Sequence, residues 1–425
     1  MVRKKMLEKN KILKEILIQN ISQLSKAEDL DESVIKSGIL NGTMVLLKNP
    51  NHKDCIPTLI GQPASIKVNA NLGTSPFLND LKLELSKLKA AEKAGAHTVM
   101  DLSTGGDLDH IRKTIISETS LPVGTVPIYS VAQKYILKHK DPSCMSTEEI
   151  FEEIEKQAEQ GVDFMTLHCG VTERAVRLVK EGKRVLGIVS RGGSILAKWI
   201  EKNKKENPLL TNYERLLKIC LKHNVVISLG DGLRPGAGCD AGDMAQWEEV
   251  IVLGELSKKA KEYGVQTMIE GPGHVPIHLI QSQIQGIKRI CNGAPLYVLG
   301  PLTTDIAPGY DHIAGAIGGA LAGFFGADFL CYITPAEHLT LPNENDVWIG
   351  VKASLIAAHS AEVALGRRKA VEKDYAISLA RSNLDWEKIA SLAIDPDLVK
   401  RRRERFASKK ECAMCGEFCA VKLLK

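Results

Sequence analysis

The sequence Gln246-Trp-Glu-Glu-Val-Ile-Val-Leu-Gly-Glu-Leu-Ser-Lys-Lys-Ala-Lys-Glu-Tyr263, followed by Thr267-Met-Ile-Glu270 and Gly271-Pro-Gly-His274, contains the pattern that decides the fold. In the first part apolar residues recur at helical spacing, and the second part is a short apolar run of the kind that forms a buried strand. The strand ends in a carboxylate, two glycines and a histidine. A helix that leads into a buried strand with polar residues at its carboxyl end indicates a parallel α/β sheet.

The same alternation of strands and helices runs along most of the chain. Nine apolar runs have the length and composition of strands: Ile66–Ala70, Thr98–Met100, Gly124–Ile128, Phe164–Leu167, Val185–Val189, Val225–Leu229, Thr267–Ile269, Leu296–Leu299 and Phe329–Ile333. Helical patterns between them include Leu81–Ala94, Glu148–Gln160, Ala175–Lys183, Tyr213–His223 and His278–Ile290. Eight or so repeats over about 270 residues predict a closed (β/α)8 barrel of the TIM type. Since such a barrel has eight strands, one of the nine predicted strands is surplus.

The pattern divides the chain into four segments. We expect a mainly helical N-terminal segment at residues 1–59, the catalytic barrel at 60–343, a helical extension at 344–408 and a tail at 409–425 that binds a metal cluster. Within the extension, Trp386 and Leu392 are expected to be buried anchors. The fold class is therefore α/β, with helical additions at both ends.

Composition limits the classes of function. The chain has 425 residues, of which 44% are apolar and 25% charged, and a net charge of +5. These values are typical of a globular protein, and the charge bias is too weak to indicate nucleic-acid binding. The apolar stretch Ile313–Ala327 is shorter than the ~20 residues that span a bilayer, so we expect a buried helix there and no membrane partner. The N-terminus lacks the apolar core of a signal peptide, which predicts a cytoplasmic protein.

Polar side chains stand at the end of nearly every predicted strand, where the βα loops of a barrel converge on one mouth. These ends are Asn69–Asn71, Met100-Asp101, Tyr129, His168, Ser190–Gly193, Asp231–Arg234, Glu270–His274, Tyr297 and Glu337-His338. So many reactive strand ends in one chain predict an active site.

Two of these strand ends have specific interpretations. Ser190-Arg191-Gly192-Gly193 offers backbone N–H groups, a hydroxyl and a guanidinium, which suits a phosphate. The alternative is a tight turn with a surface arginine. Asp231 and Arg234 could bind a polyhydroxyl or charged substrate, or could form an internal ion pair.

Two histidines are candidate metal ligands. His274 and His338 each follow a predicted strand. His274 lies beside a glycine turn, and His338 lies beside the carboxylate of Glu337. Two histidines with water in the remaining positions suit zinc. The alternative is that each histidine is structural.

Three of the ten cysteines are clustered at the C-terminus, as Cys412, Cys415 and Cys419. Three thiolates at this spacing can bind three corners of a [4Fe–4S] cluster and leave the fourth iron open to a substrate or cosubstrate. Structural zinc is the alternative, although it normally has four protein ligands.

Taken together, these motifs resemble the phosphomethylpyrimidine synthase family, ThiC of thiamine biosynthesis. The resemblance extends from about Ile60 to the C-terminus. It is carried by Lys67–Thr74, Val99–Gly105, Gly124–Tyr129, Gly187–Gly193, Ser228–Gly236, Glu270–Pro276, Leu299–His312 and Cys331–His338. The cysteine spacing is C-x2-C-x3-C, one residue shorter than the C-x2-C-x4-C of many longer family members.

The resemblance implies a radical S-adenosylmethionine (SAM) lyase that is a homodimer. Its reduced [4Fe–4S] cluster would cleave SAM, and 5-aminoimidazole ribonucleotide would be rearranged to 4-amino-5-hydroxymethyl-2-methylpyrimidine phosphate. By motif match, the residues that would contact the ribonucleotide are Asn71, Met100, Tyr129, His168, Ser190, Arg191, Gly192, Asp231, Arg234, Glu270 and Tyr297. His274 and His338 would bind zinc near SAM. An electron donor is required, but the sequence does not identify it.

Three alternatives stay open from the sequence alone. The closest is 5-hydroxybenzimidazole synthase of anaerobic cobamide biosynthesis, which resembles this family and uses the same ribonucleotide. The others are a zinc-dependent barrel hydrolase or lyase, and a binding protein with a zinc knuckle. In the leading interpretation the extension carries the tail back over a barrel mouth as a lid, from the same chain or from a partner subunit.

Overall fold

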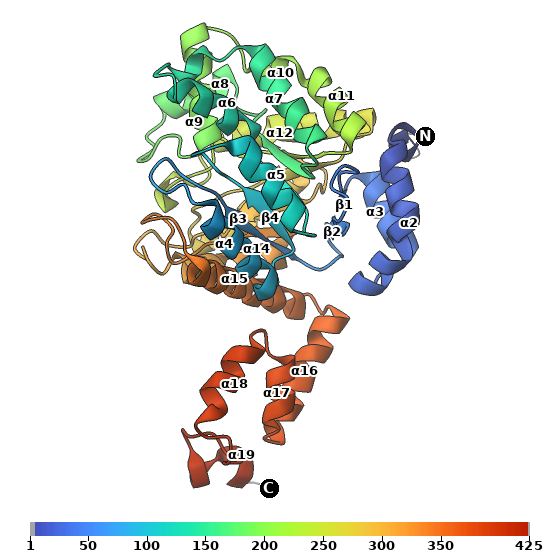
Figure 1. Cartoon of the computed structure of the whole chain (residues 1–425), viewed down its shortest axis with the longest axis vertical. Helices are drawn as coiled ribbons and strands as arrows, with labels where there is room; N and C mark the ends of the chain where they lie inside the picture. The colour runs from blue at the N-terminus through green and yellow to red at the C-terminus, as the bar shows by residue number, and fades with distance from the viewer. Residues whose placement is uncertain (1–4, 424–425) are drawn as a thin grey trace. The chain divides into compact units, whose positions relative to one another are not determined.

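The computed structural model of the protein describes residues 5–423 (Figure 1). The chain divides into two compact units. The boundary between them lies after Ala358, within helix α15 (Glu344–Ala364). In the described part of the chain, no helix is both long and apolar enough to span a membrane.

The first unit contains a closed barrel of eight parallel strands, which confirms the predicted fold class. Each strand pairs with its neighbour in chain order. The last strand pairs with the first, with Phe329 opposite Lys67, Leu330 opposite Val68 and Cys331 opposite Asn69. The strands are β3 (Lys67–Leu72), β4 (Thr98–Asp101), β5 (Val123–Thr125), β6 (Phe164–Leu167), β7 (Val226–Leu229), β8 (Thr267–Glu270), β9 (Leu296–Leu299) and β10 (Phe329–Cys331).

Helices follow the strands and surround the barrel, as the apolar periodicity predicts (Figure 1). The longer ones are α4 (Leu81–Ala94), α5 (Leu108–Glu118), α6 (Pro127–Ile136), α7 (Thr147–Glu159), α8 (Glu173–Glu181), α9 (Arg191–Asn203), α11 (Tyr213–His223), α12 (Met244–Tyr263), α13 (Ile280–Ile290) and α14 (Asp311–Phe325). A short helix, α10 (Pro208–Thr211), precedes α11.

The surplus strand is Val185–Val189, for which the prediction was wrong. This segment is a loop between α8 and α9, and Val185 and Leu186 are more than half exposed. Their backbone N–H groups donate to the Asp240 carboxylate rather than to a neighbouring strand. The strand predicted at Gly124–Ile128 also ends early, at Thr125, so Tyr129 lies in the first turn of α6.

Helix α14 differs from the fully buried helix that its apolar sequence predicts. Its glycine face is packed closely, because a Cβ at Gly318 would lie 1.9 Å from the carbonyl oxygen of Pro301. The opposite face carries Ile313, Ile317 and Phe324, which are 50%, 47% and 42% exposed. The helix therefore has a packed face and an exposed apolar face.

The N-terminal segment packs beside the barrel and has its own apolar core. It contains α1 (Lys5–Lys9), α2 (Lys11–Glu28), α3 (Glu32–Asn41) and an antiparallel pair, β1 (Val45–Leu47) and β2 (Thr58–Ile60). Three polar residues connect the barrel to this N-terminal segment, and each lies immediately before a barrel strand. Gln266 exchanges two hydrogen bonds with the backbone of Leu46, and the Asp328 carboxylate accepts from the N–H of Gln62 at 2.6 Å. The segment therefore contacts the amino ends of the strands.

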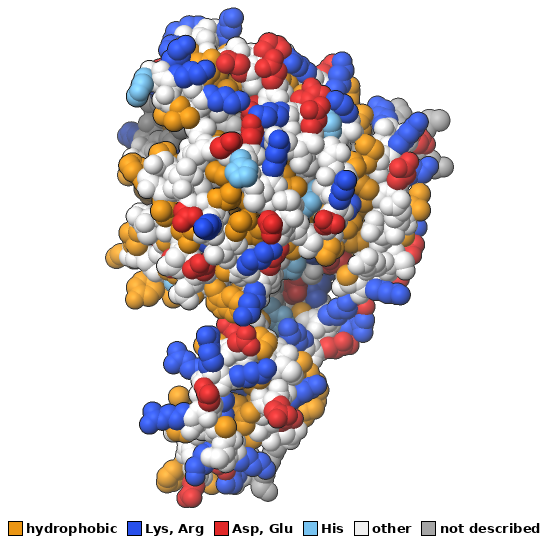
Figure 2. Space-filling view, in the orientation of Figure 1, with side chains coloured by type: hydrophobic (Ala, Val, Ile, Leu, Met, Phe, Trp, Pro, Cys, Tyr) orange, Lys and Arg blue, Asp and Glu red, His pale blue; other side chains and the backbone are white. Residues whose placement is uncertain are grey.

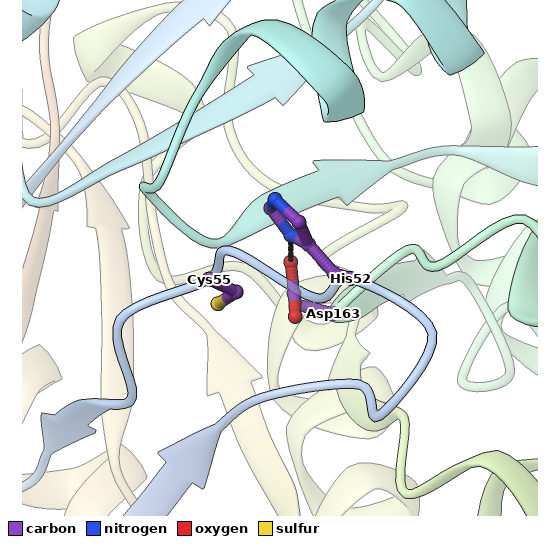
Figure 3. Close-up of side chains that lie close together, drawn as sticks. All are labelled: His52, Cys55 and Asp163. Carbon is purple, nitrogen blue, oxygen red and sulfur yellow. Dashed lines mark hydrogen bonds and ion pairs between the residues drawn. The ribbon is translucent and has the colours of Figure 1, made fainter.

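The third of these connections is a buried cluster of His52, Cys55 and Asp163 (Figure 3). His52 Nδ1 donates to Asp163 Oδ2 at 2.8 Å, and Nε2 donates to the carbonyl oxygen of Thr119 at 3.0 Å. Although burial opposes the charged ring, these bonds raise the pKa of His52. Because both ring nitrogens act as donors, the cluster is an ion pair rather than a site for a metal.

The second unit is helical. Its elements include α16 (Arg368–Ser382), α17 (Trp386–Leu392), α18 (Pro396–Glu404) and the short helix α19 (Ala420–Leu423). Trp386 and Leu392, predicted to be buried, are partly exposed. Basic side chains are frequent on this unit (Figure 2), and they include the run Lys400–Arg403.

Replacing Asp163 with Asn should lower the free energy of unfolding by about 3–5 kcal/mol, because it leaves a buried imidazolium without its counter-charge. Since the pKa of His52 is raised, the stability from this pair is present below about pH 6.5 and is lost as the pH rises through the raised pKa. The deficit should therefore be larger at pH 6 than at pH 9 in denaturant titrations. Asp54→Asn, at a neighbouring exposed position, is the control. Equal losses in the two variants would contradict a special role for the pair.

Candidate active site

The carboxyl ends of the barrel strands enclose a cavity that brings together most of the predicted site residues. Its lining includes, from the predicted set, Asn71, Met100, Tyr129, His168, Asp231, Arg234, Glu270 and Tyr297. These residues come from strands far apart in the sequence, and only the closed barrel makes them neighbours. Ser190, Arg191 and Gly192 do not line this cavity, but they contact residues that do.

One wall of the cavity is a network of hydrogen-bonded amide and phenol side chains, at the place where β10 pairs with β3. Asn69 Nδ2 lies 2.9 Å from Tyr297 Oη and 2.8 Å from Asn71 Oδ1. The side-chain amide of Asn71 contacts Cys331 Sγ at 3.1 Å. Burial raises the pKa of Tyr297, so its hydroxyl stays protonated. The wall is therefore polar, uncharged and held rigidly by strand residues.

The floor contains a partly buried carboxylate, Glu270, at the end of β8. One oxygen, Oε1, accepts hydrogen bonds from Thr166 Oγ1 at 2.6 Å and Ser228 Oγ at 2.8 Å. Burial raises the pKa of Glu270, and the two hydroxyl donors oppose this shift. Two strands thus hold Glu270 in one orientation, and it can accept or donate a hydrogen bond toward a ligand.

The first turn of α9 packs directly on His168. Ser190 Oγ lies 3.1 Å from His168 Nε2, and it also accepts the N–H of Gly193 as the helix N-cap. A Cβ at Gly192 would lie 2.2 Å from the imidazole, so only glycine permits this approach. Burial lowers the pKa of His168 to about 3, which keeps the ring neutral. Its buried Nδ1 has no hydrogen-bond partner in the described chain.

Arg191 stands beside this turn and is exposed. Its guanidinium lies 4.6 Å from the centre of the Tyr129 ring, a cation–π distance. The start of α9 therefore presents a helix N-terminus, a hydroxyl and a positive charge next to the cavity. This arrangement favours an anionic group.

Asp231 and Arg234 are within hydrogen-bonding distance of each other. Arg234 Nη1 lies 2.9 Å from Asp231 Oδ1, and both residues line the cavity. Burial raises the pKa of Asp231 to about 8, although Arg234 opposes the shift. Pairing and ligand binding are compatible, because each side chain has further hydrogen-bonding groups.

Two buried residues near the cavity were missed by sequence reasoning. Glu249 in α12 accepts a hydrogen bond from the N–H of Leu233 at 2.8 Å and so holds the loop that contains Asp231 and Arg234. Burial raises the pKa of Glu249. Cys331 lines the cavity at the end of β10. Its position after a predicted strand was the only available signal, whereas Glu249 looks like any charged residue on a helix.

His274 and His338 lie together, as a shared metal site requires. Their ring centres are 5.2 Å apart. Nδ1 of His274 lies 2.7 Å from Asp305, and Nδ1 of His338 lies 3.4 Å from Asp311. Carboxylates bound to the outer ring nitrogens are typical of metal-ligating histidines, because they fix the ring and leave Nε2 for the metal. The pair therefore fits a divalent ion such as zinc.

A second cavity adjoins the first and shares Asn71 and Leu102 with it. Its wall includes Arg191 at the start of α9, Glu337, and His338 of the histidine pair.

The three C-terminal cysteines lie in the second unit, and the structure shows them in one loop. The N–H of Gly416 donates to the carbonyl of Cys412 at 3.1 Å, which turns the chain between the first two cysteines. Backbone N–H groups of Cys415 and Met414 point at the Cys412 sulfur and lower the pKa of its thiol. An iron–sulfur cluster binds cysteines as thiolates, so a turn that favours the Cys412 thiolate suits this role, although the nearby Cys412 raises the pKa of Cys415.

Known proteins resemble the whole chain. The sequence model of the radical SAM ThiC family matches residues 8–425. A phosphomethylpyrimidine synthase of Thermoanaerobacter sp. is 50% identical over 96% of this chain and 95% of that protein. One of Methanocaldococcus jannaschii is 50% identical over 96% of each chain.

A solved dihydropteroate synthase of Stenotrophomonas maltophilia is similar to 76% of this chain and to 99% of its own. The identity is 11% and the TM-score is 0.43.

Asp231→Asn should become more stable than the wild type as the pH rises. The pKa of Asp231 is raised to about 8, so its stabilising contribution is complete below pH ~4 and is lost as the pH rises to about 8. Asparagine does not ionise. Between pH 5 and pH 9, the melting temperature of the variant should therefore rise by a few degrees relative to the wild type.

Asp243→Asn is the control of opposite sign. Although burial opposes it, hydrogen bonds from Arg184 lower the pKa of Asp243, so this variant should lose stability at neutral pH. If Asp231→Asn were less stable than the wild type throughout this range, Asp231 would be an ionised partner of Arg234.

Proposed function

The chain belongs to the radical SAM ThiC family, and from this we propose that it acts as a phosphomethylpyrimidine synthase, a lyase of thiamine biosynthesis. The observation that carries the proposal is 50% identity to proteins of that name over 96% of the chain. Nothing in the comparisons favours the benzimidazole synthase or the zinc-dependent hydrolase.

The family implies SAM and an iron–sulfur cluster. Cys412, Cys415 and Cys419 would hold three corners of a [4Fe–4S] cluster and leave the fourth iron open to SAM. When bound and reduced, such a cluster supplies the electron that cleaves SAM to a 5′-deoxyadenosyl radical. The electron must come from a separate donor.

The substrate in this proposal is 5-aminoimidazole ribonucleotide. Its phosphate would lie at the start of α9, where Ser190, Arg191 and the Gly192 N–H offer donors to an anion. The base and ribose would occupy the adjoining cavity, near the unpartnered Nδ1 of His168 and the fixed carboxylate of Glu270. The polar, uncharged Asn69–Tyr297 wall suits a small heterocycle with exchangeable donors and acceptors.

Zinc would bind to His274 and His338, with Asp305 and Asp311 orienting the rings. A second copy of the chain would form a homodimer. The exposed apolar face of α14, with Ile313, Ile317 and Phe324, is the kind of surface that a subunit covers. We also propose a cytoplasmic location and no nucleic-acid partner.

Product analysis tests the proposal directly. Protein purified without oxygen is supplied with SAM, a chemical reductant and 5-aminoimidazole ribonucleotide, and the products are identified by mass spectrometry. Formation of 4-amino-5-hydroxymethyl-2-methylpyrimidine phosphate supports the proposal. Formation of 5-hydroxybenzimidazole would establish the alternative, and a colourless protein without iron would contradict both.

Cys419→Ala should abolish SAM cleavage and lower the iron content, because a site with three cysteines has no spare ligand. Iron content and the absorption near ~400 nm check this after anaerobic reconstitution. Cys144→Ala, at an exposed cysteine outside the loop, is the matched control and should keep both. Full iron in the Cys419→Ala protein would contradict the assignment of the ligands.

Arg191→Ala should weaken binding of the ribonucleotide more than binding of the dephosphorylated nucleoside. Loss of a charge-assisted contact to phosphate reduces affinity roughly ten- to a hundredfold. Calorimetry with both ligands measures the difference, and Arg177→Ala, on the exposed surface of α8, is the control. Equal losses for the two ligands would show that Arg191 does not contact the phosphate.

A further inference from the structure

Two side chains of the helical extension hold the backbone immediately before the cysteine loop. Arg403, at the end of α18, donates from Nη1 to the carbonyl of Glu411 at 3.0 Å and from Nη2 to the carbonyl of Lys409 at 2.6 Å. Trp386, at the start of α17, donates from Nε1 to the carbonyl of Lys410 at 2.8 Å. Three consecutive carbonyls, of residues 409–411, are therefore bound by side chains.

The two side chains also hold each other. The guanidinium of Arg403 lies 4.0 Å from the centre of the Trp386 ring, which is a close cation–π contact. Only arginine combines a planar face for stacking with diverging N–H groups that reach two carbonyls, and lysine cannot replace it in both roles. We call this pair the Arg403–Trp386 clamp.

A separate contact joins the residues on either side of the cysteine loop. Lys422 forms an ion pair with Glu411, and its backbone N–H donates to the carbonyl of Cys419 at 2.9 Å. Two contacts therefore hold the cysteine loop. The clamp binds the backbone before Cys412, and the ion pair of Glu411 with Lys422 joins the two ends of the loop.

We propose that Arg403 and Trp386 are positioning residues that order the cysteine loop before the cluster binds. The inference rests on the proposed role of Cys412, Cys415 and Cys419 as cluster ligands. The clamp fixes the backbone that leads into Cys412, so that less conformational entropy is lost when three thiolates close around a cluster. The few buried residues of α18 and the loop give this region little other support.

Hydrogen exchange and iron release test the clamp in the full-length protein. Trp386→Phe keeps an aromatic ring under Arg403 and removes the N–H that binds Lys410, together with one of the two fused rings of the indole. Arg403→Lys keeps the charge and removes the two-carbonyl contact. Arg402→Lys makes the same chemical change at an exposed neighbour and is the matched control.

In cluster-free protein, amides 412–419 should exchange roughly five- to tenfold faster in Trp386→Phe and Arg403→Lys, as expected for the loss of one or two hydrogen bonds. After anaerobic reconstitution, both variants should also release iron faster to a chelator, and Arg402→Lys should behave as the wild type. The amides of α16 and α17 should keep their protection.

Three results would overturn the proposal or its premise, and they are distinguishable. Wild-type exchange and iron release in both variants, with iron lost in Cys419→Ala, would show that the loop does not need the clamp. Loss of protection throughout α16 and α17 would show that the pair only stabilises the helices. Full iron in Cys419→Ala would remove the premise itself.

Discussion

The closed ring of parallel backbone hydrogen bonds is the constraint on which the rest of the structure depends. Its last link is the pairing of β10 with β3, which joins residues more than 250 positions apart in sequence. Because the strands are parallel, their carboxyl ends lie at the same end of the sheet, and closure arranges these ends around one mouth. Asn69 and Tyr297 can therefore form one wall, and Thr166 and Ser228 can both donate to Glu270.

The two ends of the barrel use buried polar groups differently. At the amino ends, Asp163 and Asp328 have their oxygens occupied by backbone N–H groups and by a cationic partner, His52 or Lys288. Such groups stabilise the fold. At the mouth, burial raises the pKa of Asp231 and Glu270, and His168 keeps an unpartnered nitrogen. These groups reduce stability until a ligand satisfies them, which is typical of active sites.

The cysteine unit depends on a different kind of stabilisation. Its last helices bury few side chains, and the loop contains the strongly exposed Met414 and Phe418. Local contacts such as the Arg403–Trp386 stack and the Glu411–Lys422 pair replace an apolar core there. A metal cluster would add covalent links to this scaffold, so that binding of the cluster and ordering of the loop are coupled.

The alternation of strands and helices, the barrel, the polar strand ends and the three clustered cysteines can be read from the sequence, because apolar periodicity and local spacing are properties of neighbouring residues. Other features depend on contacts between residues that are distant in the chain. Val185–Val189 has the composition of a strand, but it has no partner strand and lies exposed. Glu249 resembles any helical carboxylate until the Asp231–Arg234 loop folds over it. Arg403 belongs to a basic run, and only the fold places it over Trp386 and against the backbone before Cys412.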